Sequence, residues 1–293
     1  METTVCDICA LPLSGPFLRR DHKGFPCRVS MCMACGLVKL SPRWSQSKYD
    51  WFYAKKYDFF YRDPGVGAAA LFETDLAGKG QTMRERLRDL PFPEKIRMLD
   101  IGAGTGFSFF TLPESVKVEA FAIEASAKCV PFLKFKGVSI VGADFSVPFG
   151  EDYHFIVARH VLEHVLDPAA FLRKIRDSLA HDGYFYVAVP NAMIFNEKKA
   201  SSFFRHIHTY YFNLKTFLLL CKTAGLLPVR GEQDNEVWAI LRKDERGNVG
   251  NPFLPEISPE EQLAVVKKYA GRSRQPLKRQ AVTIARRLYY RAV

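Results

Sequence analysis

The sequence predicts an α/β protein built on a seven-stranded, doubly wound sheet, with a small cysteine-rich module at the N-terminus and a basic helical tail at the C-terminus. Strand-like and helix-like hydrophobic patterns alternate through the middle of the chain, as in sheets covered by helices on both faces. The first of these strands runs into three closely spaced glycines. The chain then divides into four parts: 1–45 as the cysteine module, 46–95 as an aromatic-rich cap with a linking helix, 96–243 as the sheet, and 244–293 as a linker and tail.

The composition indicates a folded protein without a membrane span. The 293 residues are 48% hydrophobic and 13% aromatic, enough for one core of about 150 to 200 residues and an appendage. No apolar run approaches the roughly 18 to 20 residues that cross a bilayer, and the first residues lack the basic and apolar regions of a signal peptide. We therefore expect a cytoplasmic protein, in which seven cysteines indicate metal binding before disulfides.

Two cysteine pairs, Cys6–Cys9 and Cys32–Cys35, are separated by 22 residues. Four thiolates at this spacing form the ligand set of a tetrahedral, structural Zn²⁺, and a metal crosslink suits a module too small to bury much surface. A redox-active pair is the competing interpretation, but no βαβ pattern surrounds either pair. The other three cysteines are expected to be buried thiols rather than ligands: Cys27, Cys129 and Cys221.

Aromatic residues are concentrated between Tyr49 and Tyr61. Tyr53, Tyr57 and Tyr61 recur at intervals of four, so a helix would place their hydroxyls on one face. We expect this segment either to cover the site as a lid, with Tyr57 contacting the substrate, or simply to pack against the core. A helical pattern from 71 to 90, ended by a proline, then leads to the first strand of the sheet.

The first strand, 96–101, carries Asp100 near its end and continues into Gly102, Gly104 and Gly106. Glycines at this spacing let the chain turn sharply while the backbone lies close against a bound small molecule. A dinucleotide fingerprint would need glycine at position 107, where this chain has phenylalanine. The alternative use of such a turn is close packing of a strand against a helix.

The second and third strands are each followed by an acid. Glu124 follows the strand 118–123, about twenty residues after the glycine turn, where a carboxylate can accept hydrogen bonds from ribose hydroxyls. Asp144 follows the strand 138–141, and its side chain either faces a ligand or caps its own turn.

The stretch from Asp100 through Gly102 and Gly104 to Gly106 resembles motif I of the class I S-adenosylmethionine-dependent methyltransferases, which have a Rossmann-like fold. The resemblance implies S-adenosylmethionine as the methyl donor, with Asp100 near its amino group and the glycines against its methionine and ribose portions. It also implies that Asp144 meets the adenine amino group.

After a fourth strand, 153–158, this family often shows Leu-Glu-His-Val, which the chain has at 162–165. His160 is expected at the rim of the pocket, in contact with the cofactor. His160 and His164 flank Glu163 at a spacing that could suggest a metal site. We do not expect one, because the order differs from the zincin motif and no third ligand is evident in the sequence.

The cysteine pairs are followed by Gly36-Leu37-Val38 and Ser41-Pro42-Arg43, and this order of parts resembles a bacterial methyltransferase subgroup in which a zinc module precedes the core. That subgroup is tied to sugar, surface-polysaccharide or natural-product tailoring. The resemblance extends to about Lys243 and implies a glycan or small-molecule acceptor and a role such as polysaccharide biosynthesis.

A fifth strand, 184–189, is followed by an insertion that contains His206 and His208. In methyl transfer from a positively charged sulfur, a methyltransferase mainly aligns the acceptor and removes the acceptor's proton, and a neutral histidine can accept that proton. The resemblance places a His-x-His segment ahead of Tyr211-Phe212. In an extended segment both rings would line one pocket, with His208 as the base and His206 beside it; structural histidines are the alternative.

In the related sugar C-methyltransferases that this chain resembles, the segment is His-Glu-His, whereas this chain has Ile207 in the position of the glutamate. Loss of that carboxylate favours methylation of a hydroxyl oxygen. A sugar C-methyltransferase, an RNA methyltransferase and a binding protein with a degenerate core are the alternatives. A helix over 214–224 and strands at 226–230 and 237–241 complete the predicted sheet.

The C-terminal segment is one-sided in charge. A capping box at Ser258 opens a helix to about Ala270. From Leu263 to Val293 there are nine Lys or Arg and no Asp or Glu, in a chain whose net charge is +11. An apolar stripe at helical spacing continues through the tail: Leu277, Ala281, Ile284 and Leu288. Such a helix could pack on the core, lie on anionic lipid at the inner face of the membrane, or bind RNA. We expect no nucleic-acid partner, because the charge is concentrated in the tail, and the oligomeric state stays open.

Overall fold

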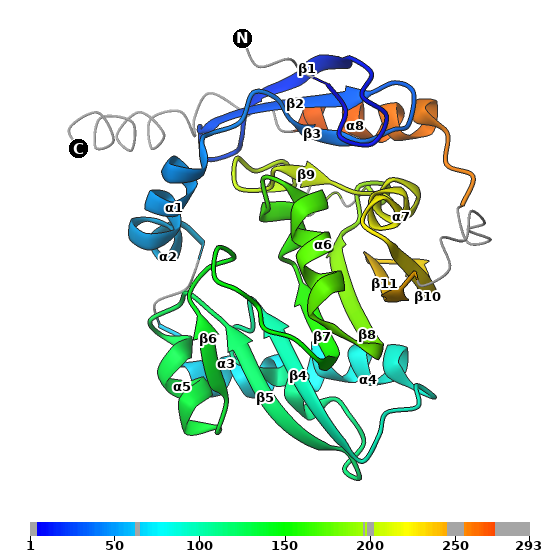
Figure 1. The fold of residues 1–293 in the computed structure, drawn as a ribbon. Coiled ribbons are helices and arrows are strands. Elements are labelled where there is room, and N and C mark those ends of the chain that lie inside the picture. The colour runs from blue at the N-terminus through cyan, green and yellow to red at the C-terminus, as the bar shows by residue number, and fades with distance from the viewer. Residues whose placement is uncertain (1–4, 62–64, 196, 198–201, 245–254, 273–293) are drawn as a thin grey trace.

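The computed structural model describes residues 5–61, 65–195, 197, 202–244 and 255–272. Within these residues the chain forms two sheets, a large one of seven strands and a small one of four, as Figure 1 shows. The apolar stripe predicted between Leu277 and Leu288 lies outside the described residues. No helix among the described residues is long and apolar enough to cross a membrane.

The strands of the large sheet lie in the order β10, β11, β8, β7, β4, β5, β6. Their bounds are β4 Lys95–Ile101, β5 Lys117–Ile123, β6 Ser139–Gly142, β7 Tyr153–Arg159, β8 Leu179–Pro190, β10 Leu226–Gln233 and β11 Glu236–Lys243. β11 pairs antiparallel with both neighbours, and the other pairs are parallel. This sheet confirms the predicted α/β, Rossmann-like fold.

Helices cover both faces of the large sheet. Those on one face are α3 (Ala68–Asp75), the π-helical turn η1 (Leu76–Gly80), α4 (Gln81–Leu87) and α5 (Cys129–Phe135), and those on the other are α6 (Pro168–Ser178) and α7 (Leu214–Thr223). In β4, Met98 packs in the α3 and α4 cluster, whereas Leu99 packs in the α6 and α7 cluster. Both side chains are fully buried, because the strand has helices packed on both of its faces.

Local signals in the sequence begin the two helices on the second face. The Asp167 side chain caps α6 by accepting a hydrogen bond from the Ala170 amide at 2.9 Å, and Pro168 occupies the first position. Asn213 and Thr216 form a capping box at the start of α7. The helix predicted over 71–90 is instead divided into α3, η1 and α4.

A small antiparallel sheet combines the N-terminal module with a strand from far along the chain. Its strands are β1 (Leu13–Arg20), β2 (Pro26–Cys32), β3 (Val38–Leu40) and β9 (Tyr210–Tyr211). α8 (Pro259–Arg272) packs against this sheet, and one buried cluster contains Val29, Tyr211 and Val266. Figure 1 shows this sheet above the large one, with α1 (Gln46–Lys55) and α2 (Tyr57–Tyr61) at its side. Segments predicted as separate parts of the chain thus share one core.

Candidate active site and cysteine centre

The glycine turn after β4 has left-handed backbone at all three glycines, with φ of +70° at Gly102, +57° at Gly104 and +76° at Gly106. A Cβ at Gly102 would lie 2.7 Å from Val161 Cγ2, and one at Gly106 would lie 2.6 Å from Leu133 Cδ2. A Cβ at Gly104 would meet nothing within 4 Å. Gly102 and Gly106 are therefore required for packing, whereas Gly104 borders open space that a ligand can fill.

The acids beside this turn are held by hydrogen bonds. Asp100 is buried and accepts a hydrogen bond from the Ser108 hydroxyl, and burial raises the pKa of its carboxyl to about 7. Glu124 accepts from the amides of Gly104 and Ser126, each at 2.7 Å. The Glu124 carboxylate thus fixes the glycine turn, and its predicted contact with a ribose stays a prediction.

Asp144 lies in the exit turn of β6 and is exposed. Its carboxylate accepts hydrogen bonds from the amide and the hydroxyl of Ser146, at 2.8 and 2.5 Å, which lower its pKa. This is the turn-capping arrangement considered from the sequence, and the predicted adenine contact stays a prediction.

A cavity of about 810 Å³ lies where β7 and β8 end and β11 begins. Tyr57, Arg159, His160, Glu163 and His208 are among its lining residues, together with residues of η1 and α4. The glycine turn does not line the cavity, but the two are adjacent. Val161, which lies between lining residues, is the side chain that a Cβ at Gly102 would strike.

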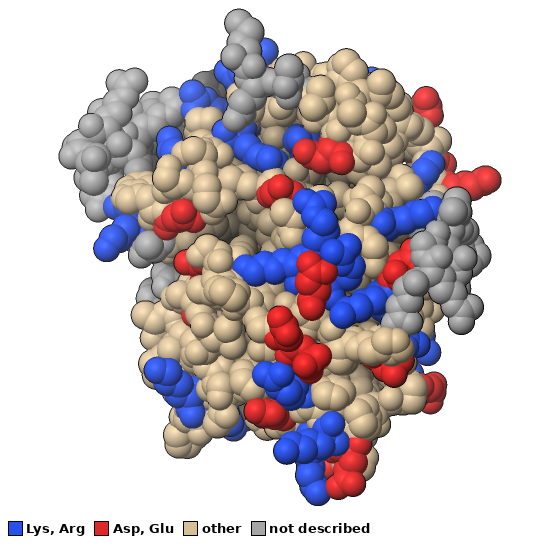
Figure 2. Space-filling model, viewed as in Figure 1, with Lys and Arg blue, Asp and Glu red and all other residues tan. Residues whose placement is uncertain are grey.

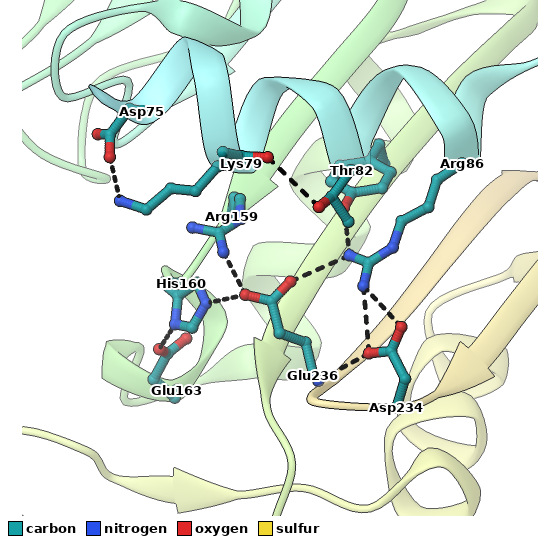
Figure 3. A network of polar contacts seen from close by, with 11 residues as sticks. Asp75, Lys79, Thr82, Arg86, Arg159, His160, Glu163, Asp234 and Glu236 are labelled. Carbon is teal, nitrogen blue, oxygen red and sulfur yellow. Dashed lines mark hydrogen bonds and ion pairs between the residues drawn. The ribbon is translucent and has the colours of Figure 1, made fainter. Parts of the chain in front are cut away.

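Glu236, at the start of β11, is the centre of a polar network (Figure 3). Its carboxylate accepts from Arg86 at 3.0 Å and from Arg159, and lies 2.6 Å from His160 Nε2. Burial opposes ionisation of Glu236, but His160 and the two arginines outweigh it and hold its pKa at about 2. Arg86 also binds Asp234, with both carboxylate oxygens within 3.1 Å.

Arg86 and Glu236 are functional-site residues that the sequence does not predict. They are distant in the sequence, and neither belongs to a recognisable motif. The only local signal was the polar turn at 234–236 between two predicted strands.

His160 joins this network to Glu163 in the short 3₁₀ turn Leu162–His164. Its backbone is left-handed, with φ of +56°, and its Nδ1 lies 3.3 Å from Glu163 Oε1. Burial would lower the pKa of His160, but Glu163 and Glu236 outweigh burial and raise it. His160 is thus at the cavity wall, as predicted, although its described partners are carboxylates.

His206 and His208 point in different directions. The His208 amide donates to the Arg205 carbonyl at 3.1 Å, so the segment is a turn rather than the extended chain we expected. His206 is 1% exposed, and its Nδ1 lies 2.8 Å from Asp21 Oδ2 among aromatic rings that include Phe25. Of the two histidines only His208 lines the cavity, so the expectation that both would share it is wrong.

The four predicted cysteines of the N-terminal module converge, from the turn before β1 and from the end of β2 and the turn after it. The Sγ atoms of Cys6 and Cys35 are 3.4 Å apart, as are those of Cys9 and Cys32, and all four lie within 4.8 Å of one another. Zn–S bonds of about 2.3 Å in a tetrahedron put sulfur atoms about 3.8 Å apart, so the group fits Zn²⁺. Cys27 is buried outside it.

Residues 75–230 match the family model of the methyltransferase domain. The chain belongs to this methyltransferase family. The match runs from the end of α3 through the glycine turn and the segment that carries His208, and it ends within β10.

Two solved structures resemble the methyltransferase. A candidate O-methyltransferase of Nostoc punctiforme is 18% identical, with 60% of this chain and 58% of that chain covered and a TM-score of 0.49. An S-adenosylmethionine-dependent methyltransferase of Mesorhizobium loti is 14% identical, with 57% of this chain and 100% of that chain covered and a TM-score of 0.48. This chain thus spans a little over half the length of the Nostoc protein. No curated protein matches the methyltransferase.

Proposed function

We propose that this methyltransferase methylates a hydroxyl oxygen of a sugar, glycan or other small molecule, and that His208 removes the hydroxyl proton. The position of His208 carries the proposal. Its ring lines the cavity beside His160 and Glu163, and the intervening Val161 packs against the glycine turn. A methyl donor bound at the glycine turn and an acceptor bound in the cavity would then lie on the two sides of residues 160–163.

The residues at the glycine turn fit the methyl donor. Gly104 leaves the space that a bound ligand would occupy, and the Asp100 carboxylate is buried behind it. S-adenosylmethionine supplies a methyl group already activated by positive sulfur. In our proposal Asp100 and the glycines hold its amino acid portion, Glu124 and Asp144 lie near the ribose and adenine, and His160 lines the side towards the acceptor.

The environment of His208 keeps its ring neutral. Burial, followed by the nearby His164, lowers the pKa of His208 well below its usual range. A lowered pKa makes a weaker base, but it leaves the ring nitrogen unprotonated at neutral pH. Among the described residues none hydrogen-bonds to this ring, which leaves a nitrogen available to an acceptor hydroxyl. Tyr57 lines the same cavity and is our proposed substrate contact.

Methylation of a sugar carbon is the second candidate. The sequence lacks a glutamate at position 207, but the structure places the Glu163 carboxylate within 4.8 Å of a ring nitrogen of His208. This pair could assist removal of a proton from carbon. Ile207 is 1% exposed and packs with Phe52 and Phe60, so its own position serves the aromatic cluster.

A small-molecule acceptor suits the charge of the molecule better than RNA does. Figure 2 shows Lys and Arg interspersed with Asp and Glu over the face it presents, rather than a continuous basic surface. The cavity wall is mixed in charge as well, because Lys79, Arg86, Arg159 and Arg205 lie beside Glu163, Asp234 and Glu236, so it offers no continuous basic track for a phosphate backbone. We further propose a structural zinc ion at the cysteines and membership of the glycan-tailoring subgroup.

The decisive test combines a variant with an acceptor screen. Mass spectrometry should detect a gain of one methyl group on a nucleotide sugar or glycan and none on RNA. His208→Ala should lower turnover by roughly 10² to 10⁴ while S-adenosylmethionine affinity stays unchanged, because loss of a base slows the chemical step. The control is His181→Ala, an exposed histidine away from the cavity, which should retain full turnover. Full turnover in His208→Ala would remove the proposed base.

A further inference from the structure

Glu163, His164 and His208 converge on one wall of the cavity. One ligand atom of each lies within 4.8 Å of the others. We propose that these three side chains bind a divalent transition-metal ion of the zinc type, separate from the cysteine centre. Two imidazoles and one carboxylate are a ligand set that leaves one coordination position of such an ion open.

The Glu163 carboxylate provides the first argument. Its side chain is 1% exposed, and neither carboxylate oxygen has a hydrogen-bond partner among the described residues. Its Oε1 lies 3.3 Å from His160 Nδ1 and 3.8 Å from His164 Nε2. A buried carboxylate without hydrogen bonds is costly even beside His160, and a bound cation would satisfy it.

The tautomer of His164 provides the second argument. Its Nδ1 lies 2.9 Å from the Ile207 carbonyl, to which an Nδ1–H can donate, and 2.8 Å from the Tyr53 hydroxyl. The lone pair is then on Nε2, the nitrogen that faces Glu163. A histidine that ligates a metal usually donates its other N–H to a carbonyl or carboxylate in this way.

The third ligand comes from a segment that is already fixed against the first two. The Thr209 amide donates to the Glu163 carbonyl at 2.6 Å, and its hydroxyl donates to the Val165 carbonyl at 2.8 Å. The ring of His208 stands at 85° to that of His164, with centroids 4.9 Å apart. Bonds of about 2.0 to 2.1 Å in a tetrahedron place ligand atoms about 3.3 Å apart. Side-chain rotations that move these atoms by roughly 1 Å would therefore close the site.

The open position of such an ion would face the cavity. A catalytic role of the ion rests on the proposed function, whereas the binding of the ion is independent of that function. An acceptor hydroxyl bound there would have a lowered pKa, so its O–H bond would break with loss of the proton to water in the cavity. In the ion-bound protein His208 is then a ligand, and the ion replaces it as the group that activates the hydroxyl.

Cobalt titration of the full chain tests the site directly. The protein is first given one equivalent of Zn²⁺, which the four thiolates bind before a site of two imidazoles and a carboxylate, and Co²⁺ is then added without S-adenosylmethionine or acceptor. We expect about one equivalent of bound Co²⁺ with ligand-field absorption in the visible and no thiolate charge-transfer band in the near ultraviolet. Glu163→Gln and His208→Ala should each weaken this binding at least about tenfold, and His181→Ala should leave it unchanged.

The outcomes separate this proposal from the proposed function. Co²⁺ binding that is absent, or that is equal in the wild type and both variants, overturns the ion site and leaves His208 as a free base. Co²⁺ binding lost in both variants supports the site even if no acceptor is methylated. If Glu163→Gln does not fold, as judged by its thermal transition, His208→Ala decides the result, because its partly exposed ring leaves no buried charge behind.

Discussion

At the scale of single residues, the same residue type does different work at neighbouring positions. Gly102 and Gly106 prevent clashes with Val161 and Leu133, whereas Gly104 borders open space. His206 is buried against Asp21, whereas His208 lines the cavity two residues later. Burial and contacts, rather than residue type, separate the structural members of each motif from those available to a ligand.

Replacement of Gly104 tests the donor site. Gly104→Val should weaken S-adenosylmethionine binding at least about tenfold, about 1.4 kcal/mol, because the side chain would fill the ligand's space. Gly137→Val is the matched control. Gly137 also has positive φ, +80°, and an open Cβ position, so backbone strain is similar while the donor site is untouched. Calorimetry should show normal affinity in the control. Equal affinity in both variants would place the donor elsewhere.

Asp100 gives a stability that depends on pH. Burial raises the pKa of its carboxyl from 3.8 to about 7. At pH values between these two, the folded state therefore holds a proton that the unfolded state has lost. The resulting stabilisation is fully present below about pH 4 and is lost as the pH rises through about 7, by up to about 4 kcal/mol.

Urea unfolding of the wild type and of Asp100→Asn across this range measures that loss. Asparagine does not titrate and keeps an oxygen for the Ser108 hydroxyl. The variant should therefore gain stability relative to the wild type as the pH rises. Glu236, with a pKa of about 2, titrates below this range. A constant difference between the two proteins would contradict the assignment to Asp100.

At the scale of elements, the helix before the sheet and the final strands form one wall of the cavity. The π-helical turn η1 brings Gly78 and Lys79 to that wall, and Arg86 of α4 reaches the acids at the β10–β11 turn. The loop between those strands is thereby fixed to a helix that lies about 150 residues earlier in the chain.

Loss of the Arg86 guanidinium should destabilise the protein by about 1–3 kcal/mol, because the buried Tyr186 hydroxyl loses a hydrogen-bond partner and Glu236 loses one of its cations. Arg86 is 7% exposed and also donates to the Tyr186 hydroxyl at 2.9 Å. Arg86→Met keeps the apolar part of the side chain. Arg84→Met on the exposed face of the same helix is the control, and it should change the free energy of unfolding by less than about 1 kcal/mol. Similar losses in the two variants would contradict the role of the network.

At the scale of the whole molecule, the cysteine module is not an isolated appendage. Cys6, Cys32 and Cys35 belong to the same buried cluster as residues of the large sheet. β9 completes the small sheet and directly follows the segment that carries His208. A metal at the cysteines would therefore stabilise one wall of the cavity as well as its own module.

Replacement of one ligand tests the cysteine centre. Cys32→Ser should lower the bound zinc by about one equivalent and lower the temperature of thermal unfolding, since the crosslink between the two cysteine turns is lost. Cys129→Ser, a buried cysteine outside the group, is expected to keep its zinc. Emission spectroscopy of metal content in freshly purified protein measures both. Equal zinc content in the two variants would show that the four thiolates are not the ligands.

The sequence by itself determined the large sheet and the glycine turn. Their signals are local: alternating strand and helix patterns, caps such as Asn213, and glycines at positions whose backbone is left-handed. The cysteine group was also predictable, because ligand spacing within each pair is fixed by the turn that contains it. Strand boundaries followed from the same patterns to within about three residues, except that β8 begins at Leu179, five residues before the predicted start.

Only the tertiary structure decided how the cavity is assembled. Glu236, Arg86 and His208 come from three distant segments, and no periodicity in the sequence relates them. In the sequence, Glu163 and His164 have no evident further ligand. The structure brings His208 to them, because the Thr209 amide donates a hydrogen bond to the Glu163 carbonyl. The physical reason is that long-range backbone pairing sets which side chains meet, whereas residue patterns report only which face of an element is buried.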